Sequence, residues 1–221
     1  MIDLLVQKEL ASEQETILKA RFLGLCQALD LPSNQAKKNY QELYNLYTDS
    51  NRHYHNLVHI LNFLNLLDKY KASIEEPLLF ELAIWYHDAI YDAKAKDNEL
   101  QSARLAQKLF VKCLDEACLS QINDLIMSTE GHFPRRESQD VYLFLDFDLS
   151  ILAAEPSIYN LYSTAIWQEY KIAYIKLLYN IGRKKVLKNF LAREKIYFSP
   201  IFFTTYEAKA RQNIRLELNG K

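Results

Sequence analysis

Apolar residues recur at three- and four-residue intervals along most of this chain, and few glycines or prolines interrupt them. This spacing places apolar side chains on one face of a helix. The alternation that is typical of strands occurs only in short stretches such as residues 196–203. Four glycines and five prolines are also few for hairpins or phosphate-binding loops. The sequence therefore predicts an all-α helical bundle.

Signals for helix starts and stops divide the chain into segments. Ser12 and Glu15 are spaced like a capping box, Asp97 is a candidate N-cap, and residues 130–138 are expected to form a loop. We find no repeat, low-complexity tract or linker, so we expect a single domain over residues 1–221. We expect helices over residues 12–29, 33–47, 54–69, 76–90, 97–112, 119–128, 141–153 and 156–179, with shorter ones over 183–193 and 204–218.

Charge and cysteine content exclude several classes of protein. The formal net charge is −1, which gives no reason to expect nucleic-acid or acidic-membrane binding, although a local basic patch stays open. No apolar stretch has the roughly 18 residues of a membrane-spanning helix. The first residues turn acidic too early for a signal peptide, and three cysteines without a CxxC pair fit a reducing compartment. We therefore expect a cytoplasmic protein without a membrane or nucleic-acid partner.

Histidine is rare in the chain and is concentrated in one segment. Of the five histidines, three fall within residues 52–59. His55 and His59 are four residues apart, so on a helix they share one face and can converge on one centre. Taken alone, this spacing is more common among surface residues than among metal ligands.

Acidic residues also interrupt two strongly apolar runs. His87 and Asp88 follow one such run, and Asp146 and Asp148 lie inside another. Burial of an uncompensated carboxylate costs several kcal/mol, so these acids must meet a cation, hydrogen-bond donors or water. The residues alone leave two alternatives of equal weight, namely a metal centre and a buried salt-bridge network with arginine or lysine.

The order of these residues resembles the signature of the HD superfamily of metal-dependent phosphohydrolases. Residues 54–59 are also similar to the Tyr-His-Asn-x-x-His motif of the cyclic-nucleotide phosphodiesterases of that superfamily, and residues 148–150 resemble the segment that carries their last metal ligand. Nearly the whole chain is similar to a bacterial family of predicted HD-type phosphohydrolases. That similarity rests on residues 52–59, 87–92, 98–103, 146–152 and 169–170.

The resemblance implies an HD-type helical domain whose metal-site core spans about residues 50–180. Its implied metal ligands are His59, His87, Asp88 and Asp148, with Asp146 as the alternative to Asp148. His55 matches the histidine that protonates the leaving oxygen in the phosphodiesterases, so His55 and Asp88 are the expected catalytic residues.

Further residues near the motifs receive weaker roles. His132, Asp146 and Arg52 could serve a second metal or the substrate. Glu99 and Glu169 could orient a histidine from outside the ligand set. The shortage of histidines argues against a full four-histidine dinuclear site, so we expect one tightly bound metal and at most a weaker second one.

These expectations describe a metal-dependent phosphohydrolase. A metal-bound hydroxide would hydrolyse a phosphomonoester or phosphodiester of a small phosphorylated metabolite or nucleotide. The donor set suits Mn, Mg, Fe, Co, Ni or Zn as a divalent ion. The chain lacks the large size and the glutamine-lined pocket of the phosphodiesterases, so cyclic nucleotides are not implied. The alternatives are a non-catalytic metal- or nucleotide-binding helical module and, with less support, a diiron oxygenase. The sequence does not indicate an oligomeric state.

Overall fold

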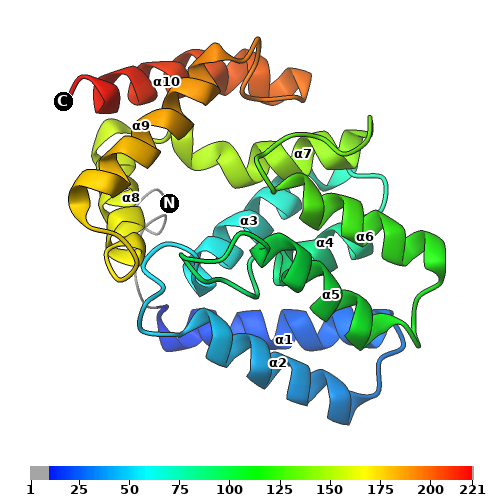
Figure 1. The fold of residues 1–221 in the computed structure, drawn as a ribbon. Helices are drawn as coiled ribbons and strands as arrows, with labels where there is room; N and C mark the ends of the chain where they lie inside the picture. Colours follow the sequence, from blue (N-terminus) through cyan, green and yellow to red (C-terminus); the bar gives the residue numbers. More distant parts are fainter. Residues whose placement is uncertain (1–9, 221) are drawn as a thin grey trace.

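A computed structural model describes residues 10–220 of the chain, and the prediction of an all-α fold is confirmed for this part. It forms ten α-helices, two short 3₁₀ helices and no strand (Figure 1). The helices are α1 (Ser12–Ala28), α2 (Ser33–Tyr47), α3 (Leu57–Tyr70), η1 (Lys71–Ser73), α4 (Pro77–Tyr86), α5 (Asn98–Phe110), α6 (Glu116–Ser128), α7 (Gln139–Asp148), η2 (Leu149–Ala153), α8 (Pro156–Tyr170), α9 (Lys176–Ala192) and α10 (Pro200–Leu218). Within residues 10–220, no helix is long and apolar enough to cross a membrane.

The core is built around α4. This helix is apolar on nearly every side, so it is stable only where other helices cover it, and it contacts α1, α3, α5 and α6. Beside it, Phe63 of α3 lies 4.8 Å from Phe144 of α7 between ring centroids, and Phe80 of α4 lies 5.2 Å from the same ring. Burial of each such ring contributes about 1.5–3 kcal/mol. This aromatic cluster fixes α3, α4 and α7 relative to one another.

The predicted start of α1 is wrong in its detail. Ala11 occupies the N-cap position, and its N–H donates to the side chain of Gln14 at 3.1 Å. Ser12 is the first helical residue, so Ser12 and Glu15 do not form the expected capping box. The helix still begins within one residue of the expected position, because a polar side chain three residues after the cap satisfies the same exposed N–H group.

The helix expected over residues 156–179 is divided into α8 and α9. The chain turns back after Tyr170, and Tyr179 of α9 packs against α8, with ring centroids 4.9 Å from Trp167 and 5.7 Å from Tyr170. Arg183 of α9 also pairs with Glu217 of α10 at 2.9 Å. No glycine or proline marks this turn. Tertiary packing of aromatic side chains therefore overrides the local helical preference.

Asp146 anchors the end of the bundle. Its side chain is fully buried, and its two oxygens accept the N–H groups of Phe198 and Ser199, each at 2.7 Å. Ser199 is the N-cap of α10, and its hydroxyl accepts the N–H of Phe202. Burial raises the pKa of Asp146 to about 6, and the two N–H donors oppose a larger rise. Asp146 thus joins α7 to the start of α10.

Replacement of Asp146 by asparagine is expected to destabilise the protein by about 1–3 kcal/mol at pH 8, because the amide NH₂ group meets a buried N–H donor. Thermal unfolding measures this loss. The matched control is Asp68→Asn, which changes a 58% exposed carboxylate paired with Arg21 and should cost less than about 1 kcal/mol. Equal unfolding temperatures for the two variants would contradict the anchoring role.

Candidate metal centre

Three elements bring four potential ligands together in the core. His59 lies in the first turn of α3, His87 and Asp88 directly follow α4, and Asp148 is the last residue of α7. One atom each of His59, His87 and Asp148 lies within 4.8 Å of the others. Asp88 Oδ2 lies 3.1 Å from His87 Nε2 and 3.7 Å from His59 Nε2. We call these four residues the four-residue cluster.

Asn56 positions His59. The Asn56 side chain is the N-cap of α3 and accepts the N–H groups of Val58 at 2.8 Å and His59 at 3.4 Å. The sequence predicted a helix start near Tyr54, but the helix begins at Leu57 because Asn56 caps it. The cap fixes the first turn, and His59 projects from it into the core, where its side chain is 5% exposed.

Arg52 explains why α4 ends before Asp88. Its guanidinium is buried and donates to the backbone carbonyls of Asp88 at 2.6 Å, Ala89 at 2.7 Å and His55 at 2.9 Å. The carbonyls of Asp88 and Ala89 are bonded to arginine instead of to a further helical turn, and the helix expected over residues 76–90 ends at Tyr86. The irregular backbone lets the adjacent residues His87 and Asp88 face the same centre, which the 100° spacing of a helix disfavours.

The distances within the four-residue cluster fit a single bound cation. The Nε2 atoms of His59 and His87 lie 3.1 Å apart, and Asp148 Oδ1 lies 3.4 Å and 4.0 Å from them. Ligand atoms held about 2.1 Å from one ion lie about 3 Å apart when adjacent in an octahedron and about 4 Å apart when opposite. The distances between the ligand atoms of the cluster all fall near or between these limits.

The hydrogen bonding and charge of the cluster point the same way. His87 Nδ1 lies 2.9 Å from the carbonyl of Ile84, so this nitrogen carries the proton and Nε2 presents a lone pair to His59. When both imidazoles are neutral, as metal coordination requires, the two carboxylates leave a charge of about −2 in a largely buried space, which a divalent ion would balance. Imidazole and carboxylate donors suit first-row divalent metals. The cluster can therefore hold a divalent metal ion.

The pKa shifts of three of these side chains favour the metal-binding form. Burial would lower the pKa of the fourth, His87, but the neighbouring Asp88 raises it, so His87 would release a proton on binding a metal. Burial alone would raise the pKa of Asp88 and of Asp148, but the neighbouring histidines hold both values below the usual range. Burial, together with the proximity of His87, lowers the pKa of His59. Ionised carboxylates and a neutral imidazole are the forms that coordinate metals.

His132 lies at the edge of the cluster. Its Nε2 is 3.1 Å from Asp148 Oδ2, the oxygen turned away from His59. The residue has a φ of 53°, a conformation that non-glycine residues rarely adopt. Arg193 donates to the carbonyls of His132 and Gly131, each at 2.7 Å, and so supports this strained loop.

His55 is paired with a buried acid. Its Nδ1 lies 2.7 Å from Glu169 Oε2, and Glu169 Oε1 accepts the backbone N–H groups of residues 53, 54 and 55. The hydroxyl of Tyr91 also donates to Glu169 at 3.1 Å. Burial alone would lower the pKa of His55, but pairing with Glu169 raises it to about 9. Burial would raise the pKa of Glu169, and the charge of His55 lowers it to about 2.

The cluster opens into a cavity of about 340 Å³. His55, Asp88, His132 and Asp148 line this cavity, and α9 supplies Val186, Leu187 and Phe190 to its wall. Glu99 lines the same cavity, and burial raises its pKa. The expected site residues His55, Asp88, His132, Asp148 and Glu99 therefore share one space.

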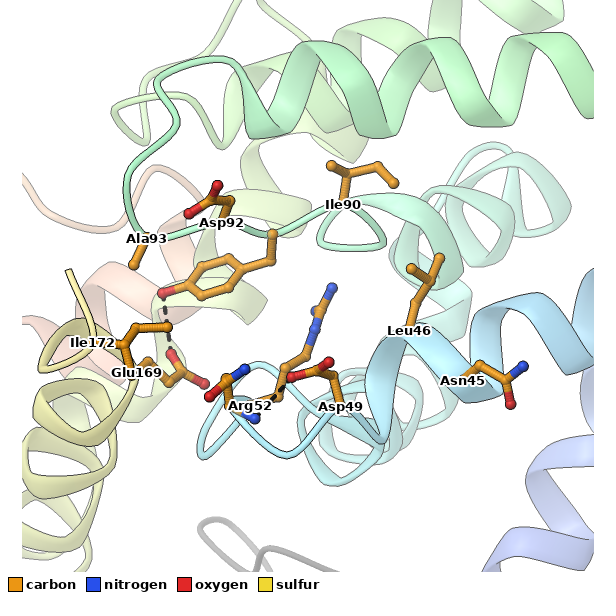
Figure 2. Close-up of a pocket in the computed structure, with 11 residues that line it drawn as sticks. Asn45, Leu46, Asp49, Arg52, Ile90, Asp92, Ala93, Glu169 and Ile172 are labelled. Atoms are coloured by element: carbon orange, nitrogen blue, oxygen red, sulfur yellow. Dashed lines mark hydrogen bonds between the residues drawn. The ribbon is translucent and has the colours of Figure 1, made fainter.

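Two expected site residues lie elsewhere. The carboxylate of Asp146 is engaged with the start of α10, and Arg52 donates to backbone carbonyls. Figure 2 shows a second pocket, lined by Arg52, Glu169, Asp49 and Asp92 among others. Glu169 thus contributes to this pocket while its carboxylate binds His55 of the first cavity.

Sequence reasoning missed three supporting residues. Asn56 was not expected as a helix cap, although an asparagine before an apolar run is a known start signal. Tyr91 and Arg193 act through contacts with Glu169 and with the His132 loop. These contacts join segments 78 and 61 residues apart in the sequence, so no local signal could reveal them.

Comparison of the chain with family models, curated proteins and solved structures found no match. The resemblance to the HD superfamily therefore stays a prediction.

Replacement of Asp148 by asparagine is expected to weaken metal binding at least about tenfold, because the cluster loses a charged ligand. Titration with Mn²⁺ or Zn²⁺ in a calorimeter measures the affinity. Asp146→Asn is the matched control on the same helix and should bind metal like the wild type, since its carboxylate contacts α10. If Asp146→Asn lost metal binding while Asp148→Asn kept it, Asp146 would be the ligand instead of Asp148.

Proposed function

We propose that this protein is a metal-dependent phosphohydrolase of the HD type, which hydrolyses a phosphomonoester or phosphodiester of a small phosphorylated metabolite or nucleotide. The observation that carries the proposal is that Asp88 and Asp148 of the four-residue cluster share one cavity with a further histidine, His55, which is paired with a buried acid. A structural metal site needs the cluster alone. The His55–Glu169 pair adds a group suited to proton transfer.

The four-residue cluster would hold the ion through His59 Nε2, His87 Nε2 and carboxylate oxygens of Asp88 and Asp148. A divalent ion bound there would polarise a phosphoryl oxygen and lower the pKa of a coordinated water. The ligands sit on packed helices and capped turns, so their arrangement is preorganised rather than formed on binding.

His55 would act as the general acid. Its Nδ1 is engaged by Glu169, which leaves Nε2 as the nitrogen that can donate a proton to a leaving oxygen. Glu169 is a positioning residue, because it fixes the ring and stabilises the imidazolium. Three backbone N–H groups and Tyr91 hold Glu169 itself in place.

Lysine, histidine and arginine side chains at the cavity would donate hydrogen bonds to the phosphate. Lys96, His132 and Arg183 line the cavity, and Arg183 is already paired with Glu217 at 2.9 Å. Tyrosine and aliphatic side chains make up much of the remaining wall, including Tyr54, Tyr162 and Leu152. A compact phosphorylated molecule with an aromatic or apolar portion matches these walls.

Replacement of His55 by alanine is expected to lower kcat about 10²- to 10⁴-fold on p-nitrophenyl phosphate or bis-p-nitrophenyl phosphate in Mn²⁺, because the leaving group loses its proton donor. Metal affinity should stay within about threefold, since His55 is not in the ligand set. The matched control is His53→Ala. His53 is in the same segment of the chain as His55, but it does not line the cavity. Absence of turnover in the wild type across a wide panel of phosphate esters would favour a non-catalytic binding module.

The pH profile of kcat tests the role of Glu169. A general acid must be protonated, so activity should fall as the pH rises through the pKa of His55, which is about 9. In Glu169→Gln the imidazolium loses its partner, so this fall should move toward the ordinary histidine pKa of about 6.5. An alkaline limb that is identical in wild type and variant, with equal metal content, would remove Glu169 and His55 from the proposed pair.

A further inference from the structure

The connection between α8 and α9 exposes an unusual amount of apolar surface. Six large apolar side chains within residues 172–181 are between 40% and 66% exposed: Ile172, Tyr174, Ile175, Leu177, Leu178 and Ile181. Single exposed apolar residues are ordinary, whereas a contiguous group usually marks a binding surface. The connection lies at an edge of the molecule, below the label of α8 in Figure 1. We call residues 171–188 the exposed segment.

The exposed apolar side chains of α9 cannot turn inward unless the helix separates from the rest of the protein. The helix contacts the rest of the protein through one stripe, in which Tyr179, Leu187 and Phe190 are buried. At 100° per residue, Ile181 lies about 200° around the helix from Tyr179, on the opposite side. Leu177 and Leu178 fall near the same outer side. The outer face of α9 is therefore apolar as a consequence of the way in which the inner face packs.

The exposed segment is also positively charged. Lys171, Lys176, Lys184, Lys185 and Lys188 are all exposed. Between residues 156 and 193 the only acidic residue is Glu169, whose side chain is 0% exposed. Among residues 10–220, no carboxylate lies within 4.0 Å of these five lysines, because the lysine ion pairs there are those of Lys38 and Lys209. The near-neutral net charge of the chain thus conceals a strong local excess of positive charge.

We propose that the exposed segment binds the surface of an anionic phospholipid bilayer. The apolar side chains around Ile175 would insert below the headgroups, and the lysines further along α9 would lie at the level of the lipid phosphates. The whole-chain charge gives no reason to expect a membrane partner, but the local distribution does. The binding is peripheral and does not depend on the phosphohydrolase activity.

The combination of positive charge and apolar surface favours an anionic bilayer over a second copy of the chain or a nucleic acid. If a second copy of the chain docked on the same face through a two-fold axis, the lysines of both copies would lie in one interface. Their positive charges would repel each other. A nucleic acid would neutralise the lysines, but it would leave the apolar side chains around Ile175 and Leu178 in water. An anionic bilayer satisfies both features at once.

Co-sedimentation of the full chain with lipid vesicles tests the proposal. The protein should bind vesicles of mixed phosphatidylglycerol and phosphatidylcholine, and should bind vesicles of phosphatidylcholine alone far more weakly. Binding should also weaken at 1 M salt, where charge interactions reach only about 3 Å. Two double variants test the two parts of the surface. One replaces Ile175 and Leu178 by asparagine, and the other replaces Lys184 and Lys185 by glutamate. Each should bind the anionic vesicles at least roughly tenfold more weakly than the wild type.

Two matched controls separate the surface from general effects. Ile201→Asn with Phe203→Asn changes apolar side chains on α10 that are 47% and 45% exposed, and Lys37→Glu with Lys38→Glu changes exposed charges on α2. Both should bind like the wild type, and all four variants should keep the wild-type circular dichroism spectrum.

Three outcomes would overturn the proposal. The first is wild-type binding that is equal for anionic and neutral vesicles or that is absent. The second is a dimer in sedimentation equilibrium that the asparagine double variant in the exposed segment dissociates, which would identify a second copy as the occupant. The third is binding of RNA or DNA that depends on Lys184 and Lys185 but not on Ile175 and Leu178, without binding to anionic vesicles.

Discussion

The structure depends on how two carboxylates are accommodated in an apolar core. Asp88 and Asp148 lie against the buried imidazoles of His59 and His87, at the meeting point of α3, α4 and α7. An uncompensated buried carboxylate costs several kcal/mol, so neither acid would persist there as a packing residue. In the neutral form that binds metal, the two imidazoles would offer lone pairs and no positive charge, and a divalent cation would then supply the compensation. Metal binding and folding are on this account linked through the same four side chains.

Much of the surrounding polar network serves to hold these ligands in place. Asn56 caps α3 beneath His59, and Arg52 diverts the backbone after α4 so that His87 and Asp88 face one centre. Glu169 gathers three backbone N–H groups of the same segment and binds His55. Each of these groups is satisfied by hydrogen bonds, which explains how so much polarity can be tolerated close to the core.

The sequence was a good guide to the fold and to the side chains that come together in the core, and a poor guide to the supporting contacts. The period of the apolar residues indicated the helices, with α2 predicted to the residue, because one apolar face is enough to identify an amphipathic helix. The division of α8 from α9 was missed, because the aromatic contacts of Tyr179 decide it rather than a local breaker. The motifs could not separate Asp146 from Asp148, since both acids lie in one apolar run. Only the structure shows that Asp146 binds the start of α10 while Asp148 faces the histidines.

Everything inferred about this site requires that His59, His87, Asp88 and Asp148 bind one divalent ion. Anomalous X-ray diffraction from crystals grown with Mn²⁺, collected at an energy where manganese scatters anomalously, tests it most directly. We expect an anomalous peak about 2.0–2.2 Å from the Nε2 atoms of His59 and His87 and from one oxygen each of Asp88 and Asp148. A fully formed cluster without such a peak, or a peak bound only by other residues, would show that these four side chains are not the ligands.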